Sequence, residues 1–339
     1  MAWYNENGNN REYVLSTRVR FARNLVDYPF AERMNRAIAT EILGKIEAAL
    51  PEFTQVDFDD LPEHTALSYA EGRLVSRDFL KQRLPHRLFL HDDGKLAVMA
   101  LEEDHLRIQA ILPGLAVEEA YAAAAKVEKQ LASSLSFAFD PKLGYLTHCP
   151  TNLGTAMRVS VMLFLPALEK AGQIEKLLPS LTRLGFTLRG MYGEGSGSSG
   201  ALYQISNQVT MGITERETPS KLAELIEQII GYERHAREQM KNDLPLFDRI
   251  SDEALRAYGI LRYALSLSSA EFLELYKRLR FGICLGVDGI PGSFGSLDLL
   301  TVAVMPGTLT MQYSCNDERE RDKCRAIKVK KEIVDAGVT

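Results

Sequence analysis

The chain has 339 residues, of which 46% are hydrophobic and 25% are charged. This length and composition are typical of a soluble enzyme of roughly two domains, and they exclude a disordered or collagen-like chain. With 40 basic against 45 acidic residues the net charge is -5, which argues against sequence-independent nucleic-acid binding.

Neither a membrane span nor a metal or disulfide framework is predicted. The most apolar stretch, 159–168, is interrupted by Ser160 and Pro166 and is far shorter than the roughly 20 residues of a membrane helix. The first residues carry no secretory signal, so we expect a cytoplasmic protein. The four cysteines form no CxxC pair, which argues against a zinc ribbon and against disulfides.

The first motif in chain order is Ser16-Thr17-Arg18-Val19-Arg20. In an extended segment, Arg18 and Arg20 project from the same face, and two guanidinium groups on one face suit a polyphosphate. The alternative is a solvated edge strand.

Short strands and two helices follow. Segments 87–90, 96–101 and 106–111, with a turn at 92–94, predict an antiparallel meander. Residues 117–135 predict a helix and residues 154–165 a second one. The acidic run Glu102-Glu103-Asp104 lies between the strands predicted at 96–101 and 106–111. Like charges so close together raise the pKa of a carboxyl group, so one of the three is a candidate proton acceptor. The alternative is an acidic turn.

Cys149 is predicted to end a strand and open the second helix, where the helix dipole favours a thiolate. Arg158 would emerge from the start of the same helix. The alternative for Cys149 is a buried, inert thiol. His105 and His148 have no metal-like spacing, and we expect hydrogen-bonded structural roles for them.

Strand patterns return at 184–191 and 201–209, and the glycine-rich segment 193–200 lies between them. Its GxGxxG precedes a strand rather than a helix, so a dinucleotide-binding fold is rejected. A mobile lid that carries Glu194 inward explains the segment better, and a plain flexible turn is the alternative.

Thr218 as the N-cap and Pro219 in the first turn predict the start of a helix whose apolar residues recur three and four apart. Beyond a boundary near Asp243 the chain is predicted to be helical, over 255–266, 270–279, 297–304 and 318–334. The predicted architecture is α+β: an antiparallel sheet flanked by helices in residues 1–243, then a smaller all-α domain in 244–339.

Four motifs in order resemble the catalytic domain of the phosphagen (guanidino) kinases over about residues 14–239: STRVRFARNL (16–25), EEDHLR (102–107), CPTNLGT (149–155) and RGMYGE with YQISN (189–207). The short segment before the first motif and the helical C-terminal part resemble the bacterial protein-arginine kinases within that family. The C-terminal part carries an RDxxRA motif, Arg321 to Ala326. Alone, such a motif is a charged helix face.

The resemblance implies transfer of the γ-phosphoryl of ATP, with Mg²⁺ bound to the nucleotide and no direct protein ligand to the metal. Glu103 and Glu194 would clamp the substrate guanidinium and accept its proton, and Cys149 would orient it. Glu102 and Asp104 would support the site and hold water on Mg²⁺. The residues assigned to ATP are Ser16, Thr17, Arg18, Val19, Arg20, Arg107, Arg158, Val159, Ser160, Val161, Met162, Arg189, Gly190, Met191, Tyr192, Gly193 and Glu194. One departure is Arg73, which stands where relatives place a nucleotide-contacting histidine.

The same resemblance implies that arginine side chains of proteins are the substrate, because a guanidino pocket without an N-terminal cap is open. The RDxxRA residues Arg321, Asp322, Arg325 and Ala326 would bind phosphoarginine and couple product to activity. Expected partners are a Clp-type chaperone-protease, a stress-gene repressor, an activating adaptor and a second copy of the chain. The alternatives are a kinase for free arginine or creatine, and a non-catalytic phosphoarginine-binding regulator.

Overall fold

The computed structural model describes residues 3–5, 8–190, 200–290 and 294–335. Its centre is an eight-stranded sheet in the order β2-β3-β4-β5-β1-β8-β10-β9, in which every neighbouring pair is antiparallel. The strands are β1 Val14–Arg23, β2 Thr54–Asp57, β3 Arg87–Leu90, β4 Leu96–Ala100, β5 Leu106–Pro113, β8 Met157–Phe164, β9 Phe186–Gly190 and β10 Leu202–Asn207; β6 Phe139–Asp140 and β7 Gly144–Tyr145 form a separate hairpin.

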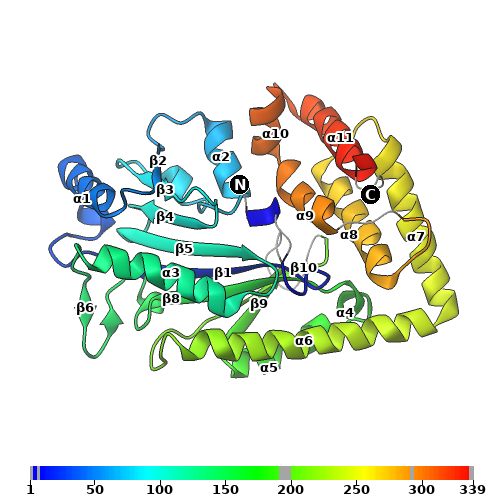
Figure 1. Cartoon of the computed structure of the whole chain (residues 1–339), viewed down its shortest axis with the longest axis horizontal. Helices are drawn as coiled ribbons and strands as arrows, with labels where there is room; N and C mark the ends of the chain where they lie inside the picture. The colour runs from blue at the N-terminus through cyan, green and yellow to red at the C-terminus, as the bar shows by residue number, and fades with distance from the viewer. Residues whose placement is uncertain (1–2, 6–7, 191–199, 291–293, 336–339) are drawn as a thin grey trace.

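Helices surround the sheet and continue beyond it (Figure 1). They are α1 Arg36–Ala49, α2 Glu63–Glu71, α3 Val117–Ala132, α4 Pro166–Lys170, α5 Ile174–Arg183, α6 Glu217–Asn242, α7 Leu244–Tyr263, α8 Ser269–Leu285, α9 Phe294–Ala303, α10 Pro306–Tyr313 and α11 Glu318–Asp335, with short 3-10 turns η1 Trp3–Asn5, η2 Ala31–Arg33, η3 Phe79–Lys81 and η4 Pro150–Asn152. No helix among these described segments is long and apolar enough to cross a bilayer. The predicted α+β architecture is confirmed.

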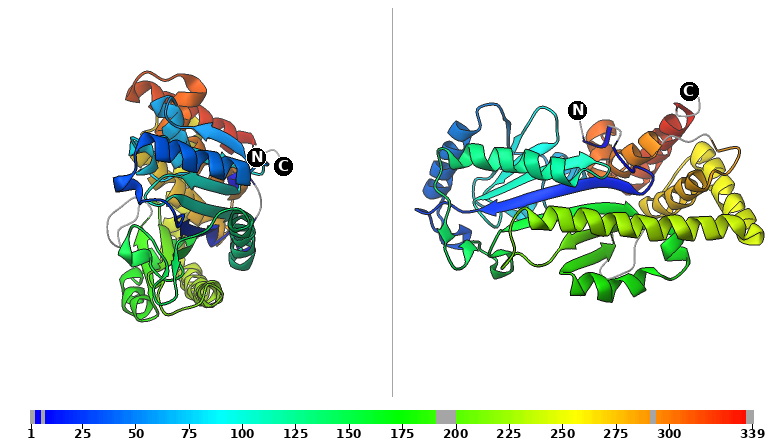
Figure 2. Two further views of the ribbon diagram at one scale, coloured as in Figure 1. Left: turned by 90° about the vertical axis from the view of Figure 1, so that its left-hand side faces the viewer. Right: turned by 60° about the horizontal axis from the view of Figure 1, so that its bottom comes forward.

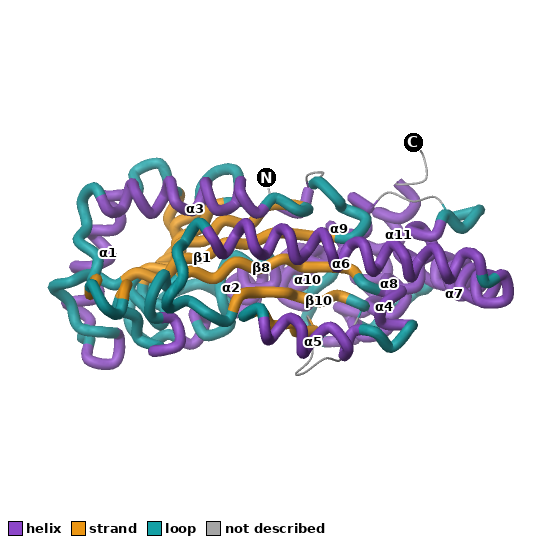
Figure 3. Tube along the Cα trace, turned by 90° about the horizontal axis from the view of Figure 1, so that it is seen from below, coloured by secondary structure: helices purple, strands orange, loops and turns teal. Residues whose placement is uncertain are grey.

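One face of the sheet is apolar because alternate residues of its central strands are apolar. Val19 and Phe21 of β1 pair with residues of β8 and β5 in antiparallel register, and the apolar side chains of these strands are buried together. Helices α3 and α6 cover this face side by side (Figures 2 and 3). The opposite face carries the polar residues of the same strands and holds the site described below.

Helix α6 joins the sheet to the C-terminal helices. Its 26 residues span about 39 Å, and it extends past the sheet to α7 (Figure 1). The helix starts at Glu217, so Thr218 lies inside its first turn and does not cap it, contrary to the prediction. Asp243 ends α6, and its carboxylate accepts a hydrogen bond from the Leu246 amide at the start of α7. The two-domain division at this residue stays a prediction, because one apolar core runs from the sheet into α7 and α8.

The second predicted helix is wrong. Residues 157–164 form β8, which pairs with β1 on one side and β10 on the other. Cys149 therefore precedes only the single 3-10 turn η4, and Arg158 projects from a strand rather than from a helix start. Cys149 therefore does not lie at the N-terminus of a full α-helix, and no full helix dipole acts on it.

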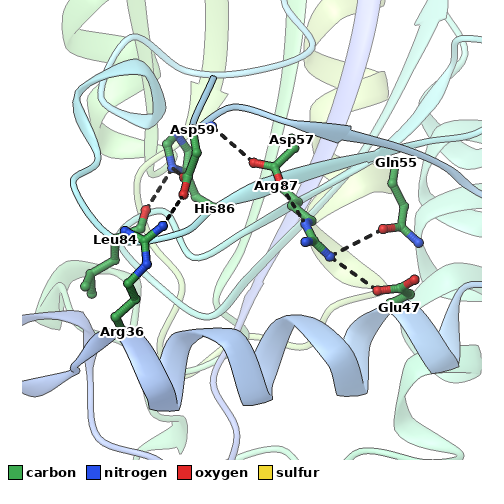
Figure 4. Close-up of polar contacts among 8 residues, drawn as sticks. All are labelled: Arg36, Glu47, Gln55, Asp57, Asp59, Leu84, His86 and Arg87. Carbon is green, nitrogen blue, oxygen red and sulfur yellow. Dashed lines mark hydrogen bonds and ion pairs between the residues drawn. The ribbon is translucent and has the colours of Figure 1, made fainter. Parts of the chain in front are cut away.

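At the edge of the sheet, exposed ion pairs connect α1 to β2 and β3 (Figure 4). Arg36 pairs with Asp59, and Arg87 reaches Glu47 and Asp57. The Arg36 side chain is 73% exposed, so water screens its pair strongly.

A contrasting ion pair is buried at the end of β1. The Arg23 guanidinium donates to Glu128 at 2.7 Å and to Glu215 at 2.8 Å, and the Tyr145 ring lies 3.4 Å from it. Replacing Arg23 by methionine leaves two carboxylates together without their cation, and should lower the free energy of unfolding by about 3–5 kcal/mol. Arg36→Met is the matched control and should change it by less than about 1 kcal/mol. Chemical denaturation of both variants tests this, and equal losses would contradict the burial argument.

Candidate active site

The polar face of the sheet carries a cluster of arginines that the strand register brings together. Directly paired residues of antiparallel strands project from the same face. Arg20 pairs with Arg158, and Arg107 pairs with Ala22, two residues further along β1. Arg18 and Arg20 therefore share a face with three arginines of neighbouring strands, which are Arg107, Arg158 and Arg189. Because β1 is central in the sheet, the solvated edge-strand alternative is wrong.

These guanidinium groups are crowded and short of counter-charge. Burial, and then the charges of nearby arginines, lower the pKa of Arg18 to about 9. The same two causes lower the pKa of Arg20 well below its usual value, against the opposing effect of Glu102. The Nε of Arg20 is buried and has no hydrogen-bond partner within the described part of the chain. Such a cluster favours a polyanion, which would relieve the repulsion and satisfy the free donors.

Polar side chains on the same face hold individual arginines in place. Ser206 of β10 accepts from Arg158 at 3.0 Å, and Gln204 accepts from Arg18 at 3.4 Å. Neither Ser206 nor Gln204 was predicted from the sequence to be a site residue. Their alternation within YQISN, two residues apart on one strand, is the signal that identifies them.

A cavity of about 260 Å³ opens where the arginines meet the acidic turn between β4 and β5, and we call it the main cavity. Its lining comes from four separate segments, which include β1, the acidic turn, η4 and the start of β8. The charged and thiol side chains that line it are Arg20, Glu102, Glu103, Asp104, Arg107, Cys149 and Arg158. The structure thus gathers Glu103, Cys149 and three of the arginines that the sequence analysis selected.

The three carboxylates of the acidic turn have different environments. Glu102 is buried and forms an ion pair with Arg107 at 2.5 Å, and Ser76 donates a hydrogen bond to it. Asp104 accepts from the Asn24 side chain at 2.6 Å and from the His148 amide at 2.8 Å. Both carboxylates already have partners, which weakens the idea that they hold water on Mg²⁺.

Glu103 is different, because its side chain is exposed to the cavity and makes no hydrogen bond or ion pair within the described residues. Partial desolvation, followed by the charges of Asp104 and Glu102, raises the pKa of Glu103. Glu102 is held in an ion pair and Asp104 by two hydrogen bonds, whereas Glu103 is free and has a raised pKa, so Glu103 is the proton acceptor that the geometry favours.

The turn that carries Glu103 is strained and firmly anchored. Leu101 has a φ of 65°, a conformation that is unfavourable for a branched side chain. His105 holds the turn in place: its ring accepts from the Leu25 amide at 3.0 Å, and its own amide donates to Asn24. Burial lowers the pKa of His105, in keeping with a ring nitrogen that accepts this hydrogen bond. The structural role predicted for His105 is confirmed.

Cys149 lies at the edge of the main cavity, with its Sγ 3.0 Å from the Thr151 hydroxyl. The loop is held by close backbone packing. Gly154 has a φ of 99°, and a Cβ there would lie 2.1 Å from the Thr210 carbonyl oxygen. Cys149 is therefore placed by tight turns rather than by a long helix.

The other residues assigned to ATP lie on one or the other face of the sheet, according to their positions along the strands. Ser16, Ser160 and Met162 lie on the arginine face, where with Arg18, Arg73 and Gln204 they line a small depression. Thr17, Val19, Val159 and Val161 are buried, and the register places them on the opposite, apolar face. Gly190 ends β9 beside the cluster. Met191, Tyr192, Gly193 and Glu194, with the predicted lid, lie outside the described residues.

In the C-terminal helices, the RDxxRA motif forms the first turns of α11. Arg321 and Asp322 are partly exposed, whereas Arg325 and Ala326 are buried. Arg325 donates to the carbonyl oxygens of Leu267 and Val304, and it pairs with Asp322. In this structure Arg325 therefore ties α11 to its neighbours.

Comparisons with known proteins now decide the family. Residues 33–236 match the model described as the ATP:guanido phosphotransferase C-terminal catalytic domain. The chain belongs to the ATP:guanido phosphotransferase family. Residues 247–337 match a second model, the C-terminal domain of the protein-arginine kinase McsB. The family resemblance inferred from the four motifs is thereby confirmed.

Two similar relatives carry the name protein-arginine kinase. That of Caldanaerobacter subterraneus is 38% identical over 94% of this chain and 96% of its own length. That of Desulforamulus reducens is 40% identical over 85% of this chain and 83% of its own. These two proteins, like the C-terminal model, place the chain in the protein-arginine kinase branch of the ATP:guanido phosphotransferases.

Solved structures share the fold of the catalytic part. The duplicated taurocyamine kinase of Schistosoma mansoni, described with bound transition-state-analogue components, matches 65% of this chain with a TM-score of 0.60 and 26% identity. The match covers 33% of that longer chain. Lombricine kinase matches 66% of this chain and 67% of its own, with a TM-score of 0.58 and 21% identity, which shows a common fold.

Proposed function

We propose that this protein transfers the γ-phosphoryl group of ATP to arginine side chains of other proteins. The observation that carries the proposal is the meeting of two opposite environments in the main cavity. A cluster of arginines that is short of counter-charge, and can therefore bind an anion, lies beside Glu103, a free carboxylate of raised pKa. Phosphoryl transfer to a guanidinium needs both, because the phosphates need cations and the guanidinium must lose a proton.

On the phosphate side, Arg18, Arg20, Arg107, Arg158 and Arg189 would bind the triphosphate. Their side chains share one face of the sheet, so they can contact several oxygens of one chain of phosphates. The depression lined by Ser16, Arg73 and Ser160 continues the same face and would take the ribose or the base.

Mg²⁺ on the nucleotide oxygens would neutralise further charge. Within the described residues, no group of three His, Cys, Asp or Glu side chains converges to hold a metal.

On the guanidinium side, the base is essential because the substrate pKa lies above 12, so that only about one arginine in 10⁵ is neutral at pH 7. Glu103 would accept the proton and align the attacking nitrogen with the γ-phosphorus. Glu194, which lies outside the described residues, would provide the second carboxylate of the clamp. Cys149, which lines the same cavity, would orient the guanidinium.

The role of Cys149 can be tested separately. If its sulfur positions and polarises the guanidinium, Cys149→Ser should lower kcat by about 10²-fold, similar to the loss of one electrostatic contact in an active site, and activity should remain measurable. Steady-state kinetics tests this prediction. Isolation of a phosphocysteine intermediate from the wild-type protein would contradict it, because the proposed transfer is direct.

The RDxxRA motif would bind phosphoarginine on this protein or on a neighbouring subunit, and would couple that product to activity. Arg321 is the informative residue to change because, unlike Arg325, it is not buried among backbone carbonyls. Arg321→Ala should weaken the binding of free phosphoarginine by about ten-fold or more and leave basal turnover unchanged. Calorimetric titration measures this, with Arg319→Ala, an exposed arginine on the same helix, as the control. Equal affinities in both variants would contradict the assignment.

Family resemblance suggests further partners. A Clp-type chaperone-protease would receive the marked proteins, a stress-gene repressor would be one substrate, and an adaptor would activate the kinase in the cytoplasm. We also propose a homodimer formed through the C-terminal helices. These partners and this assembly rest on the likeness to protein-arginine kinases.

The substrate class separates this proposal from a kinase for small guanidino compounds, the kind of activity named in the titles of the two structural neighbours. The purified protein is incubated with Mg²⁺, γ-labelled ATP and either an unfolded arginine-rich protein or free arginine. Acid-labile label on the protein is the expected result. Label confined to free arginine would overturn the protein-arginine assignment, and label on neither substrate would favour a regulator without turnover.

A further inference from the structure

Two cysteines that the proposed phosphoryl transfer does not use lie together where α10 is followed by α11. Cys315 follows α10 directly after Ser314, and Cys324 lies in the second turn of α11, within the RDxxRA motif. Their Sγ atoms are 3.3 Å apart, and both thiols are free. The segment between them is held in a tight turn, in which Asp317 and Glu320 accept hydrogen bonds from backbone amides.

The two thiols differ in exposure. Cys315 is 7% exposed, and burial together with the neighbouring thiol raises its pKa to about 11. Cys324 is partly exposed on the helix surface. An oxidant dissolved in water therefore reacts with Cys324 first, while the buried sulfur of Cys315 lies in contact with that of Cys324. A reachable thiol with a resolving thiol next to it is the arrangement found at reversible redox sites.

We propose that Cys315 and Cys324 are a reversible modification site that a hydroperoxide converts into a disulfide. The Cys324 thiolate attacks one peroxide oxygen, the O–O bond breaks, and hydroxide leaves with the thiol proton as water. Cys324 is then a sulfenic acid. The sulfur of Cys315 attacks that of Cys324, the S–S bond forms, the S–O bond breaks, and a second water leaves with the Cys315 proton. Two thiols lose two electrons in total, and the peroxide is reduced to water.

The bond would act on the motif because Cys324 directly precedes Arg325. The Arg325 side chain links α11 to the end of α9 and to the segment between α7 and α8. A disulfide from Cys324 to Cys315, which follows α10, would also tie this turn of α11 to the end of α10. It would hold Arg325 in its buried position and restrict any adjustment of Arg321 and Asp322 to a ligand. This consequence rests on the proposed role of the motif, whereas formation of the disulfide does not.

The test uses the full chain. Reduced protein is treated with hydrogen peroxide, the remaining thiols are blocked with N-ethylmaleimide, and peptides are mapped without reduction. The expected product is a peptide that joins Cys315 to Cys324 and that dithiothreitol separates again. In Cys315→Ala protein, Cys324 should instead accumulate as a sulfenic acid that dimedone traps. If Cys324 in the wild-type protein proceeds to sulfinic acid, or if both thiols stay free, the proposal is overturned.

A second readout tests the consequence. Free phosphoarginine should bind the oxidised protein at least about five-fold more weakly than the reduced protein, and reduction should restore the affinity. Binding is measured instead of turnover, since peroxide also reaches Cys149 in the main cavity. In Cys315→Ala protein, which cannot form the disulfide, peroxide should leave the phosphoarginine affinity unchanged, and an equal loss of affinity there would overturn the coupling. If the reduced wild-type protein binds no phosphoarginine, the proposed role of the motif fails, and the peptide map still decides the disulfide.

Discussion

Glu103→Gln should lower kcat by about 10²- to 10⁴-fold, because the amide keeps the size of the side chain but cannot accept the proton of the guanidinium. The protein should still fold and bind ATP, since the Glu103 carboxylate makes no hydrogen bond or ion pair within the described residues. Steady-state kinetics with an arginine-containing protein substrate measures the effect. The matched control is Glu119→Gln, an exposed carboxylate of α3 remote from the main cavity, which should be neutral.

The pH dependence gives a second signature of Glu103. A base must be deprotonated to act, so kcat/KM should fall as the pH drops through the pKa of Glu103. Because desolvation and two neighbouring carboxylates raise that pKa, this fall should occur at a higher pH than for an ordinary glutamate. In the Glu103→Gln variant this fall of kcat/KM at low pH, the acid limb of the pH profile, should disappear. An unchanged acid limb in that variant would assign the base to another group.

Arg20→Met should have the other large effect, and it acts in two opposite directions. Activity should fall by about 10³-fold or more, the scale reported for removing one arginine that stabilises a transferring phosphoryl group. The free protein should become more stable to heat, because the change removes a buried cation that is repelled by three arginines more than it is attracted by Glu102, and leaves an apolar chain of similar length.

Thermal unfolding with and without MgATP separates this prediction from a simple folding defect. The Tm of Arg20→Met should rise without nucleotide, and the upward shift that MgATP gives the wild-type protein should shrink. Arg87→Met provides the control, since Arg87 is a partly exposed strand arginine paired with carboxylates at the sheet edge (Figure 4). A lower Tm of Arg20→Met without nucleotide would contradict the assignment of the cluster as an unfilled anion site.

The sequence predicted most of the strands of the sheet because their residues alternate with a period of two. It failed at β8, where Ala156, Met157 and the later Met and Leu residues have high helix propensity. The alternation of Arg158, Ser160 and Met162 with valines was present, but β8 is central in the sheet and buried almost throughout, so the pattern reads as one apolar run.

The site was predictable in part, for a related reason. Motifs identify residue types, so Glu103, Cys149 and the arginines could be selected before their distances were known. Strand register decides which of them meet, and register depends on the whole sheet. The sequence therefore could not show that Glu102 is neutralised by Arg107 while Glu103 stays free. Nor could it show that Arg325 is buried within its motif.

The central claim is that the arginine face and Glu103 together phosphorylate arginine side chains. The most direct measurement is site-resolved mass spectrometry, at neutral pH, of an unfolded protein after incubation with MgATP and the purified chain. The account predicts phosphoryl groups on arginine side chains with the wild-type protein, and almost none with Arg20→Met or Glu103→Gln. Phosphoryl groups on serine or threonine instead, or undiminished arginine phosphorylation by both variants, would contradict it.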